Sequence, residues 1–257
     1  MLFCDAHFHA ACCKGFSGKD LDGFLGASCA HSTEEFARQE ELVASCPGQI
    51  LPLFGMHPQL PLLENADFME GLLRDKRIIG IGETGFDLFT PEFKANKKAQ
   101  EEAWNISLSL AAGYAVPVVV HDRKALDLIF RDAGKLKSLP AVIFHSFAFG
   151  PREALSILKH GLNAYFSFAK QILNGNKKSR ACVQELPLDR LLLETDAPYQ
   201  TLRGEKATSP SEIRRVYAEA ALIRGTNMEQ LAARLSANFQ EAYRTERLSR
   251  IASKASS

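Results

Sequence analysis

Short apolar segments of β type recur along this 257-residue chain, and sequence typical of amphipathic helices fills most of the gaps between them. Eight segments predict strands: Leu2–His9, Phe24–Ala30, Ile50–Met56, Ile78–Glu83, Val116–His121, Ala141–His145, Ala164–Phe168 and Arg190–Thr195. The predicted helices are Thr33–Ser45, Ala66–Arg74, Pro91–Gly113, Arg123–Leu136, Pro151–Lys159, Asn174–Glu185, Pro210–Arg224 and Met228–Arg244. Strands that alternate with helices pair in parallel through crossover connections. We therefore expect an α/β fold, a (β/α)8 TIM barrel, with a doubly wound open sheet as the alternative.

The length suits a single barrel domain, because such barrels commonly contain about 250 residues. Hydrophobic residues make up 46% of the chain and charged residues 24%, which is ordinary for a globular protein. We expect one domain over residues 1–248 and a small, polar tail over 249–257 that frays. The first crossover, Ala10–Gly23, contains three glycines and leaves room for only a short helix.

The net charge of +1 predicts no strong overall field toward nucleic acid or a membrane, so binding of a polyanion must use local basic groups. The six cysteines include no Cys-x-x-Cys pair, which favours reduced thiols over disulfides or a cysteine metal site. No apolar run approaches the roughly 20 residues of a membrane span, and the N-terminus lacks a signal-peptide pattern. We expect a cytoplasmic protein, monomeric and without an obligate protein partner.

Metal-binding residue types follow most of the predicted strands. His7 and His9 form a His-x-His at the end of the first strand, where alternate side chains share a face and can bind one cation together. The comparable residues at later strand ends are His57, Glu83, His121, His145 and Asp196. In a barrel these ends meet at one mouth, and imidazole with carboxylate is a ligand set for divalent metals. The sequence thus predicts a metal site at the carboxyl-terminal mouth.

Several neighbouring polar residues have more than one interpretation. Asp87 either orients a ligand histidine or caps a turn, and Glu194 either shares the face of Asp196 or makes a structural ion pair. Arg123 lies two residues beyond His121, where its guanidinium can bind a phosphate.

The two remaining histidines fall outside the strand-end pattern. His31 begins a loop, and His160 ends a helix before Gly161, where a cation suits the helix dipole. We interpret both as structural residues.

Six segments together resemble the TatD family of metal-dependent deoxyribonucleases, within the amidohydrolase-like metal-hydrolase barrels. They are Asp5-Ala6-His7-Phe8-His9, Gly55-Met56-His57-Pro58, Gly80–Asp87, Pro117–Arg123, Phe144–Phe147 and Pro187–Tyr199. Their order and spacing fit the family over nearly the whole chain. Departures occur in loops: Ala10 replaces a typical Leu, Phe147–Gly150 differs from a common Phe-x-Gly, and Ala207–Pro210 replaces a usual Asn-Glu-Pro.

The resemblance implies a TIM barrel that holds one to three divalent ions, and we expect two, with zinc, magnesium or manganese as candidates. It implies that His7, His9 and Asp196 bind one metal, that Glu83 bridges, and that His121 and His145 bind the second. His57 would lie at the phosphate end of the substrate site. The implied activity is phosphodiester hydrolysis of DNA, as a single strand or at its 3′ or 5′ ends.

A dinuclear centre lowers the pKa of a bound water toward about 7 and neutralises the charge that develops on both oxygens of an in-line displacement. We expect Asp196 to be the general base, Glu83 to be the second catalytic residue as the bridging ligand that the resemblance implies, and Arg123 to position the phosphate. One alternative is a metal hydrolase of a small amide, lactone or ester, which the low net charge and altered loops favour. The other is a non-catalytic relative that retains the fold.

Overall fold

The computed structural model of the protein describes residues 1–17 and 21–245, so the expected tail at 249–257 lies outside it. Eight parallel strands follow one another around a single sheet in sequence order. They are β1 (Phe3–Phe8), β2 (Phe24–Ala30), β3 (Ile50–Phe54), β4 (Gly80–Asp87), β5 (Val118–Arg123), β6 (Val142–Phe144), β7 (Ala164–Phe168) and β8 (Leu191–Leu193).

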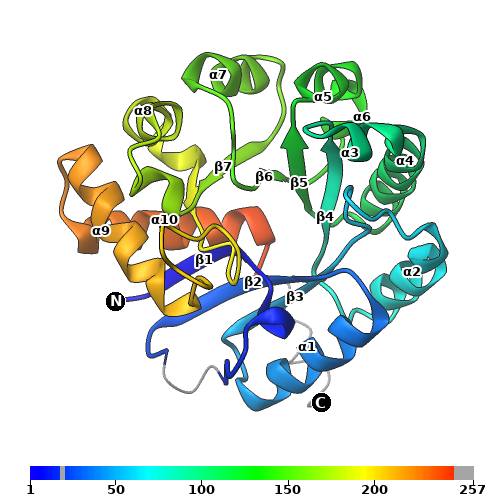
Figure 1. Ribbon diagram of the computed structural model, residues 1–257, viewed down its shortest axis with the longest axis horizontal. Coiled ribbons are helices and arrows are strands. Elements are labelled where there is room, and N and C mark those ends of the chain that lie inside the picture. The colour runs from blue at the N-terminus through cyan, green and yellow to red at the C-terminus, as the bar shows by residue number, and fades with distance from the viewer. Residues whose placement is uncertain (18–20, 246–257) are drawn as a thin grey trace.

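The two ends of this row of strands meet. The backbone N–H of Asp196, just after β8, donates to the carbonyl of His7 in β1 at 3.0 Å, and that of His9 donates to the carbonyl of Ala197 at 2.7 Å. The sheet therefore curls into a barrel surrounded by helices (Figure 1). The TIM-barrel prediction is confirmed, and the doubly wound open sheet is wrong.

The surrounding helices occupy the gaps between strands (Figure 1). They are α1 (Thr33–Ser45), α2 (Ala66–Arg74), α3 (Pro91–Ala95), α4 (Lys97–Tyr114), α5 (Leu126–Arg131), α6 (Ala133–Leu136), α7 (Pro151–Lys159), α8 (Lys177–Glu185), α9 (Ile213–Arg224) and α10 (Met228–Tyr243). The first crossover holds only the short 3-10 helix η1 (Ala10–Cys12) in its described part, as its glycines predict.

Two predicted helices are interrupted. The helix expected over Pro91–Gly113 is α3 and α4, because the side chain of Gln100 donates to the carbonyl of Phe93 at 2.8 Å and to that of Asp87 at 3.2 Å. The first bond satisfies a carbonyl of α3 where the chain turns, and the second ties α4 to the end of β4. The helix expected over Arg123–Leu136 starts only at Leu126, because β5 extends through Arg123, and it is divided into α5 and α6 at Asp132.

The hydrophobic core has two layers. Buried side chains such as Phe54, Trp104 and Phe166 belong to the cluster between strands and helices, and a second cluster that includes Ala27, Leu53 and Val119 fills the barrel. Helix α10 crosses behind the strands (Figure 1). From it, Phe239 and Tyr243 join the inner cluster, and the Tyr243 hydroxyl donates to the carbonyl of Ala6 at 2.5 Å. Apolar packing thus closes one end of the barrel and leaves the carboxyl-terminal mouth to polar residues.

Strand β4 is longer than predicted and passes unusually close to β5. Glu83 lies within β4, at a register shift between Ile81 and Thr84, and not at its end. A Cβ added to Gly82 would lie 2.6 Å from the Cβ of Val119, and one added to Gly85, with φ +137°, would lie 2.1 Å from the carbonyl oxygen of His121. The Gly-Glu-x-Gly segment is therefore required for this approach, which brings Glu83 beside the end of β5.

Candidate metal centre

The His-x-His at the end of β1 faces two carboxylates. His7 Nε2 lies 3.3 Å from Oε2 of Glu83 and 3.6 Å from Oδ1 of Asp196. His9 Nε2 lies 3.4 Å from the same oxygen of Asp196. On its other side, Nδ1 of His7 contacts the thiol of Cys29 at 3.4 Å. Both imidazoles are buried, and each directs one ring nitrogen toward the carboxylates.

The second oxygen of Glu83 faces another group of histidines. Its Oε1 lies 2.6 Å from Nδ1 of His121 and 2.6 Å from Nε2 of His145, and these two nitrogens are 3.1 Å apart. His57 Nε2 approaches the same oxygen to 3.3 Å. The carboxylate of Glu83 therefore lies between two sets of imidazoles, one from β1 and one from the ends of β3, β5 and β6.

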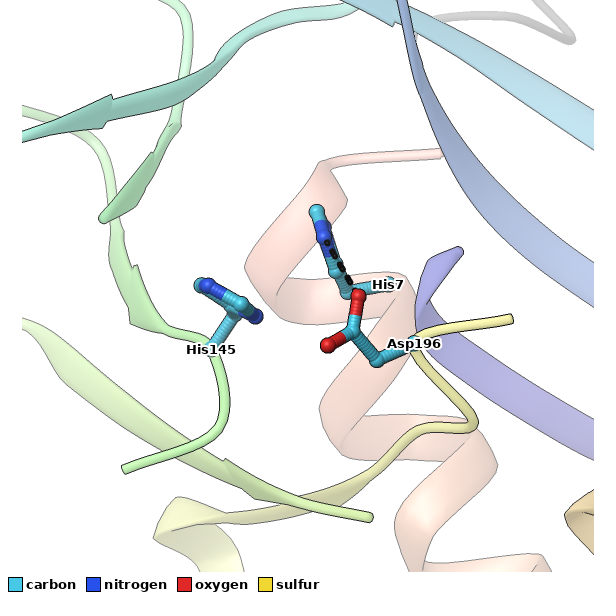
Figure 2. A group of neighbouring side chains, drawn as sticks. All are labelled: His7, His145 and Asp196. Carbon is cyan, nitrogen blue, oxygen red and sulfur yellow. Dashed lines mark ion pairs between the residues drawn. The ribbon is translucent and has the colours of Figure 1, made fainter. Parts of the chain in front are cut away.

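The ligand atoms are close enough to share cations. Figure 2 shows His7, His145 and Asp196, which come from three separate strand ends and point toward one another. Three groups have ligand atoms within 4.8 Å of one another: His7, His145 and Asp196; His7, His9 and Glu83; and His57, Glu83 and His121. The structure thus brings together all six residues that the sequence predicts as metal ligands.

The cluster contains buried ligand atoms without hydrogen-bond partners, namely Nε2 of His7, Nε2 of His31 and Nδ1 of His145. An unpaired polar atom in a protein interior is costly, and unsatisfied nitrogens beside carboxylates suit a cation. Imidazole and carboxylate donors accept Zn²⁺ and Mn²⁺ well. The residues present therefore fit a divalent metal.

Burial and mutual charge shift the pKa values of the cluster. Burial raises the pKa of Asp196 from 3.8 to about 6, although His145 and His7 oppose this. Burial also tends to raise the pKa of Glu83, but the neighbouring histidines outweigh it and hold that pKa well below the usual value. The pKa of His145 is well above its usual value, because Glu83 and Glu194 overcome the effect of its burial. Protons on histidines thus balance the buried carboxylates of this cluster.

We call these residues the metal-ligand cluster: His7, His9, His31, His57, Glu83, His121, His145 and Asp196. The cluster lies in a cleft whose wall includes Gln59, Arg123, Ser146, Gln171, Tyr199 and Gln200. The Arg123 guanidinium lies 3.7 Å from Asp87 and 4.4 Å from the ring centre of the exposed Phe89.

Asp87 has both of its predicted roles. One oxygen lies 3.2 Å from Nε2 of His121, and the other accepts the backbone N–H of Phe89 at 2.9 Å.

Two buried acids support the cluster from behind. Glu194 accepts the backbone N–H and the hydroxyl of Ser146 at 2.7 and 2.8 Å and lies 3.6 Å from Nδ1 of His145, so its ionic contact supports the loop after β6. Asp5 accepts the backbone N–H and the hydroxyl of Thr195 at 2.9 and 2.6 Å, which joins β1 to the segment after β8. No role for Asp5 was predicted, because the only signal of this residue in the sequence is an acid inside an apolar strand.

The interpretation of His31 as a residue outside the site is wrong. It follows β2 directly, and its ring centre lies 5.3 Å from that of His9 and 5.0 Å from that of His57. Its Nε2 is 3.8 Å from Oε2 of Glu83, and its Nδ1 is 3.0 Å from the carbonyl oxygen of Gly55. Burial lowers the pKa of His31 to about 3. Its position at a strand end was the signal that could have identified it.

Outside the cleft, His160 lies at the exposed end of α7 and contacts the carbonyl of Ser156 through Nδ1 at 2.7 Å, in agreement with a structural role. The six cysteines are all free, as predicted. Within residues 1–17 and 21–245, no helix is both long and apolar enough to cross a membrane.

A barrel with imidazoles and carboxylates gathered at its mouth is typical of metal-dependent hydrolases. Residues 4–244 match the family described as TatD related DNase, and the chain belongs to this family. It is 31% identical over 199 residues to the 3′-5′ ssDNA/RNA exonuclease TatD of Erwinia amylovora, an alignment that covers 74% of this chain and 76% of that protein. It is 29% identical over 188 residues to the uncharacterized metal-dependent hydrolase YabD of Bacillus subtilis, with 70% and 71% covered.

Solved structures agree on the fold. The TatD homologue YjjV from Escherichia coli K12 superimposes with a TM-score of 0.80 at 24% identity, covering 93% of this chain and 97% of that one. A TatD family hydrolase from Entamoeba histolytica gives a TM-score of 0.75 at 16% identity, with 95% and 98% covered.

Proposed function

We propose that this protein is a metal-dependent phosphodiesterase that hydrolyses DNA, acting on single strands or strand ends. The observation that carries the proposal is the position of Glu83, whose two carboxylate oxygens face separate groups of imidazoles. That arrangement suits two cations near one substrate phosphate. Relatives named as ssDNA/RNA exonucleases support the choice of nucleic acid as substrate.

In this proposal, His7, His9 and Asp196 would hold one divalent ion, His121 and His145 would hold a second, and Glu83 would be a ligand for both. Zinc, magnesium and manganese are the candidate metals. When bound, the two ions lower the pKa of a water molecule and neutralise charge on the phosphate oxygens.

Asp196 is the proposed general base. Its pKa of about 6 leaves the carboxylate deprotonated near neutral pH, so that Oδ1 can accept a proton from the attacking water. Glu83 remains a carboxylate throughout, because its pKa is held low. Asp87, which contacts His121, keeps that ring in its orientation.

His57 and Arg123 are the proposed phosphate-binding residues. Nδ1 of His57 accepts the backbone N–H of Gln59 at 3.1 Å, so a neutral ring carries its proton on Nε2 and can donate it to a phosphate oxygen. The partly exposed guanidinium of Arg123 is placed at the mouth, where it can bind a nonbridging oxygen. As part of the same proposal, residues 1–248 act as one domain, and the protein is a cytoplasmic monomer.

Asp196→Ala is the direct test. We expect it to weaken metal binding and abolish release of nucleotides from 3′- and 5′-labelled single-strand and duplex DNA, assayed with Mg²⁺, Mn²⁺ and Zn²⁺ in turn. His160→Gln, outside the cleft, serves as the matched control and should retain full activity. Unchanged turnover by Asp196→Ala would remove the assignment.

Hydrolysis of a small amide, lactone or ester is the second candidate. Arg123 is the only Lys or Arg side chain among the described residues that line the cleft, which is few for a polyanion. Assaying one metal-loaded preparation on amide, ester and phosphodiester substrates decides between the two reactions.

A further inference from the structure

Exposed apolar side chains gather at the mouth of the barrel. Among the described residues, six large hydrophobic side chains are exposed: Met1, Leu60, Phe89, Leu155, Tyr199 and Leu222. Leu60 and Tyr199 line the cleft, and Phe89 packs against Arg123, which lines it too. Single exposed apolar residues are ordinary on a protein surface, but several beside one polar cleft indicate a surface that contacts a ligand.

Phe89 is the member of this group that lies beside two positive charges. The guanidinium carbon of Arg123 and the ammonium nitrogen of Lys124 each lie 4.4 Å from its ring centre. Arg123 also contacts the buried carboxylate of Asp87 at 3.7 Å. Lys124 is exposed, and among the described residues its ammonium makes no ion pair or hydrogen bond. One of the two cations is therefore anchored, and the other is held by the ring alone.

The backbone that carries Phe89 is fixed on both sides. Its N–H donates to Oδ1 of Asp87 at 2.9 Å, and Asp87 in turn contacts the ring of His121 at 3.2 Å. The next residue, Thr90, begins α3 by accepting the N–H of Phe93 on its hydroxyl at 3.2 Å. An aromatic side chain has only two torsions, so a ring on a fixed backbone loses little entropy when a ligand packs on it.

Single-stranded nucleic acid matches this surface in two ways. Every unpaired base has a π-face that stacks on an aromatic ring, and every nucleotide brings a phosphate for a cation. A stacked base typically contributes more than an exposed cation–π contact, so a base displaces the Lys124 ammonium from the ring. Bases inside a duplex are already stacked on their neighbours and are not available to the ring.

We propose that Phe89 stacks on an unpaired base of a single-stranded nucleic-acid substrate, close to the phosphate at the metal-ligand cluster, and that Lys124 moves from the ring to a neighbouring phosphate. This inference rests on the proposed function, because the base belongs to its substrate. It narrows that substrate to strands, or strand ends, whose bases are unpaired. Phe89 therefore determines specificity and takes no part in the chemical step.

Kinetics on a single-stranded oligonucleotide test the proposal. Wild type and Phe89→Ala are loaded with the same metal and assayed on one labelled strand. We expect Phe89→Ala to lower kcat/KM about fivefold to 150-fold, chiefly through KM, which is the range for loss of one aromatic–base contact. Phe89→Tyr keeps the ring and should stay within about twofold of wild type.

Two further variants control for the loss of an exposed apolar side chain. Phe89→Leu keeps apolar bulk without a π-face and should resemble Phe89→Ala, and it keeps the test valid if the alanine disturbs the loop. Leu222→Ala, exposed on α9, should behave as wild type. Bound Co²⁺ per chain, measured by equilibrium dialysis with elemental analysis, should be equal in all of them, because none of these side chains is a metal ligand.

Dependence on the base separates stacking from an indirect effect through Arg123. The assay is repeated on a series of strands in which one nucleotide at a time lacks its base. At one position, the missing base should lower kcat/KM of wild type as much as Phe89→Ala does, and should cost Phe89→Ala nothing further. A ring that only supports Arg123 gives the same loss on every strand, with or without the base.

The possible outcomes separate this inference from the proposed function. Equal kcat/KM for wild type and Phe89→Ala on the intact strand overturns the stacking surface and leaves the phosphodiesterase assignment standing. An equal loss in Phe89→Ala on every strand of the series does the same. A wild type that binds Co²⁺ but hydrolyses no strand overturns the proposed function and the stacking surface together.

Discussion

Two clusters of buried charge lie beyond the strand ends of this barrel, and they differ in how their atoms are paired. In the Lys170 cluster, formed by Lys170, Glu205, Thr208 and Glu212, the ammonium of Lys170 is completely buried just after β7. It contacts the carboxylate of Glu205, that of Glu212 at 2.9 Å and the hydroxyl of Thr208 at 3.2 Å. The ammonium therefore meets its partners within the protein.

In the metal-ligand cluster the balance depends on protons that histidines can release, because the pKa values of His121 and His145 are raised by the carboxylates beside them. Its carboxylates converge with histidines, and three of its ring nitrogens remain buried without partners. Burial of charge alone therefore does not identify a binding site, since both clusters share it. Buried ring nitrogens without hydrogen-bond partners distinguish the candidate metal centre from the Lys170 cluster, whose ammonium is paired.

Glu83→Gln should have the largest effect, because it removes the carboxylate that faces both groups of histidines. We expect DNA hydrolysis to fall by about a thousandfold, since metal-ion stabilisation is worth several kcal/mol and each 1.4 kcal/mol is tenfold in rate. The fold should persist, because His121 and His145 can release their protons when the carboxylate is lost. Single-turnover kinetics and circular dichroism measure the two effects. Retained hydrolysis would show that the cluster is structural, like that of Lys170.

Titration of Asp196 should make the metal-free protein less stable as the pH rises. The pKa of this carboxyl is about 6 in the folded state against 3.8 as reference, so its stabilising contribution is complete below pH 3.8 and lost above about 6. The free energy of unfolding of wild type, relative to Asp196→Asn, should fall by about 3 kcal/mol across this window. Urea denaturation at a series of pH values measures it, and saturating Zn²⁺ should reverse the loss at pH 7. A difference that stays constant with pH would contradict the shifted pKa.

Lys170→Met should affect stability and leave metal binding alone. Removing one member of a buried ion pair leaves its partners uncompensated, and the expected loss is about 2 kcal/mol, because the carboxylates of Glu205 and Glu212 retain some solvent. Chemical denaturation measures this loss, with Lys135→Met on the surface as control. The comparison between the clusters fails if Lys170→Met weakens cobalt binding but not stability.

Arg123→Ala should have the smallest effect. The side chain is partly exposed and stacks on Phe89, so we expect KM for an oligonucleotide to rise about threefold to tenfold, in line with the roughly 1 kcal/mol of an exposed cationic contact. Metal stoichiometry should not change. Steady-state kinetics beside Arg74→Ala, another exposed arginine, provides the check. A fall in kcat with constant KM would place Arg123 in the chemical step instead.

Much of the fold could be predicted because the buried strands are continuous apolar runs, each recognisable without its neighbours. The predicted strand ends were too early where pairing with a neighbour extends a strand beyond its apolar run. Strands β4 and β5 continue to Asp87 and Arg123, which pair with each other, although both residues are polar. An extension of this kind depends on the partner strand, so hydrophobicity along one segment does not show it.

The candidate site, like the fold, could be predicted only in part. Histidines and acids at strand ends were recognised, because parallel strands necessarily bring those ends together. His31 occupies the same kind of position but was set aside, since a polar loop residue after β2 looks ordinary until its neighbours are known.

The amino-acid sequence by itself determined the barrel, the residues that gather at its mouth and the family, because each depends on local hydrophobic pattern and on residue type at strand ends. Tertiary structure alone decided what each ring nitrogen meets. His31 and His57 are the same residue type at the same kind of position, yet one hydrogen bonds to a carbonyl from β3's end and the other to its own loop's N–H. The lone pair of one and the proton of the other follow from those contacts, and no pattern along the chain encodes them.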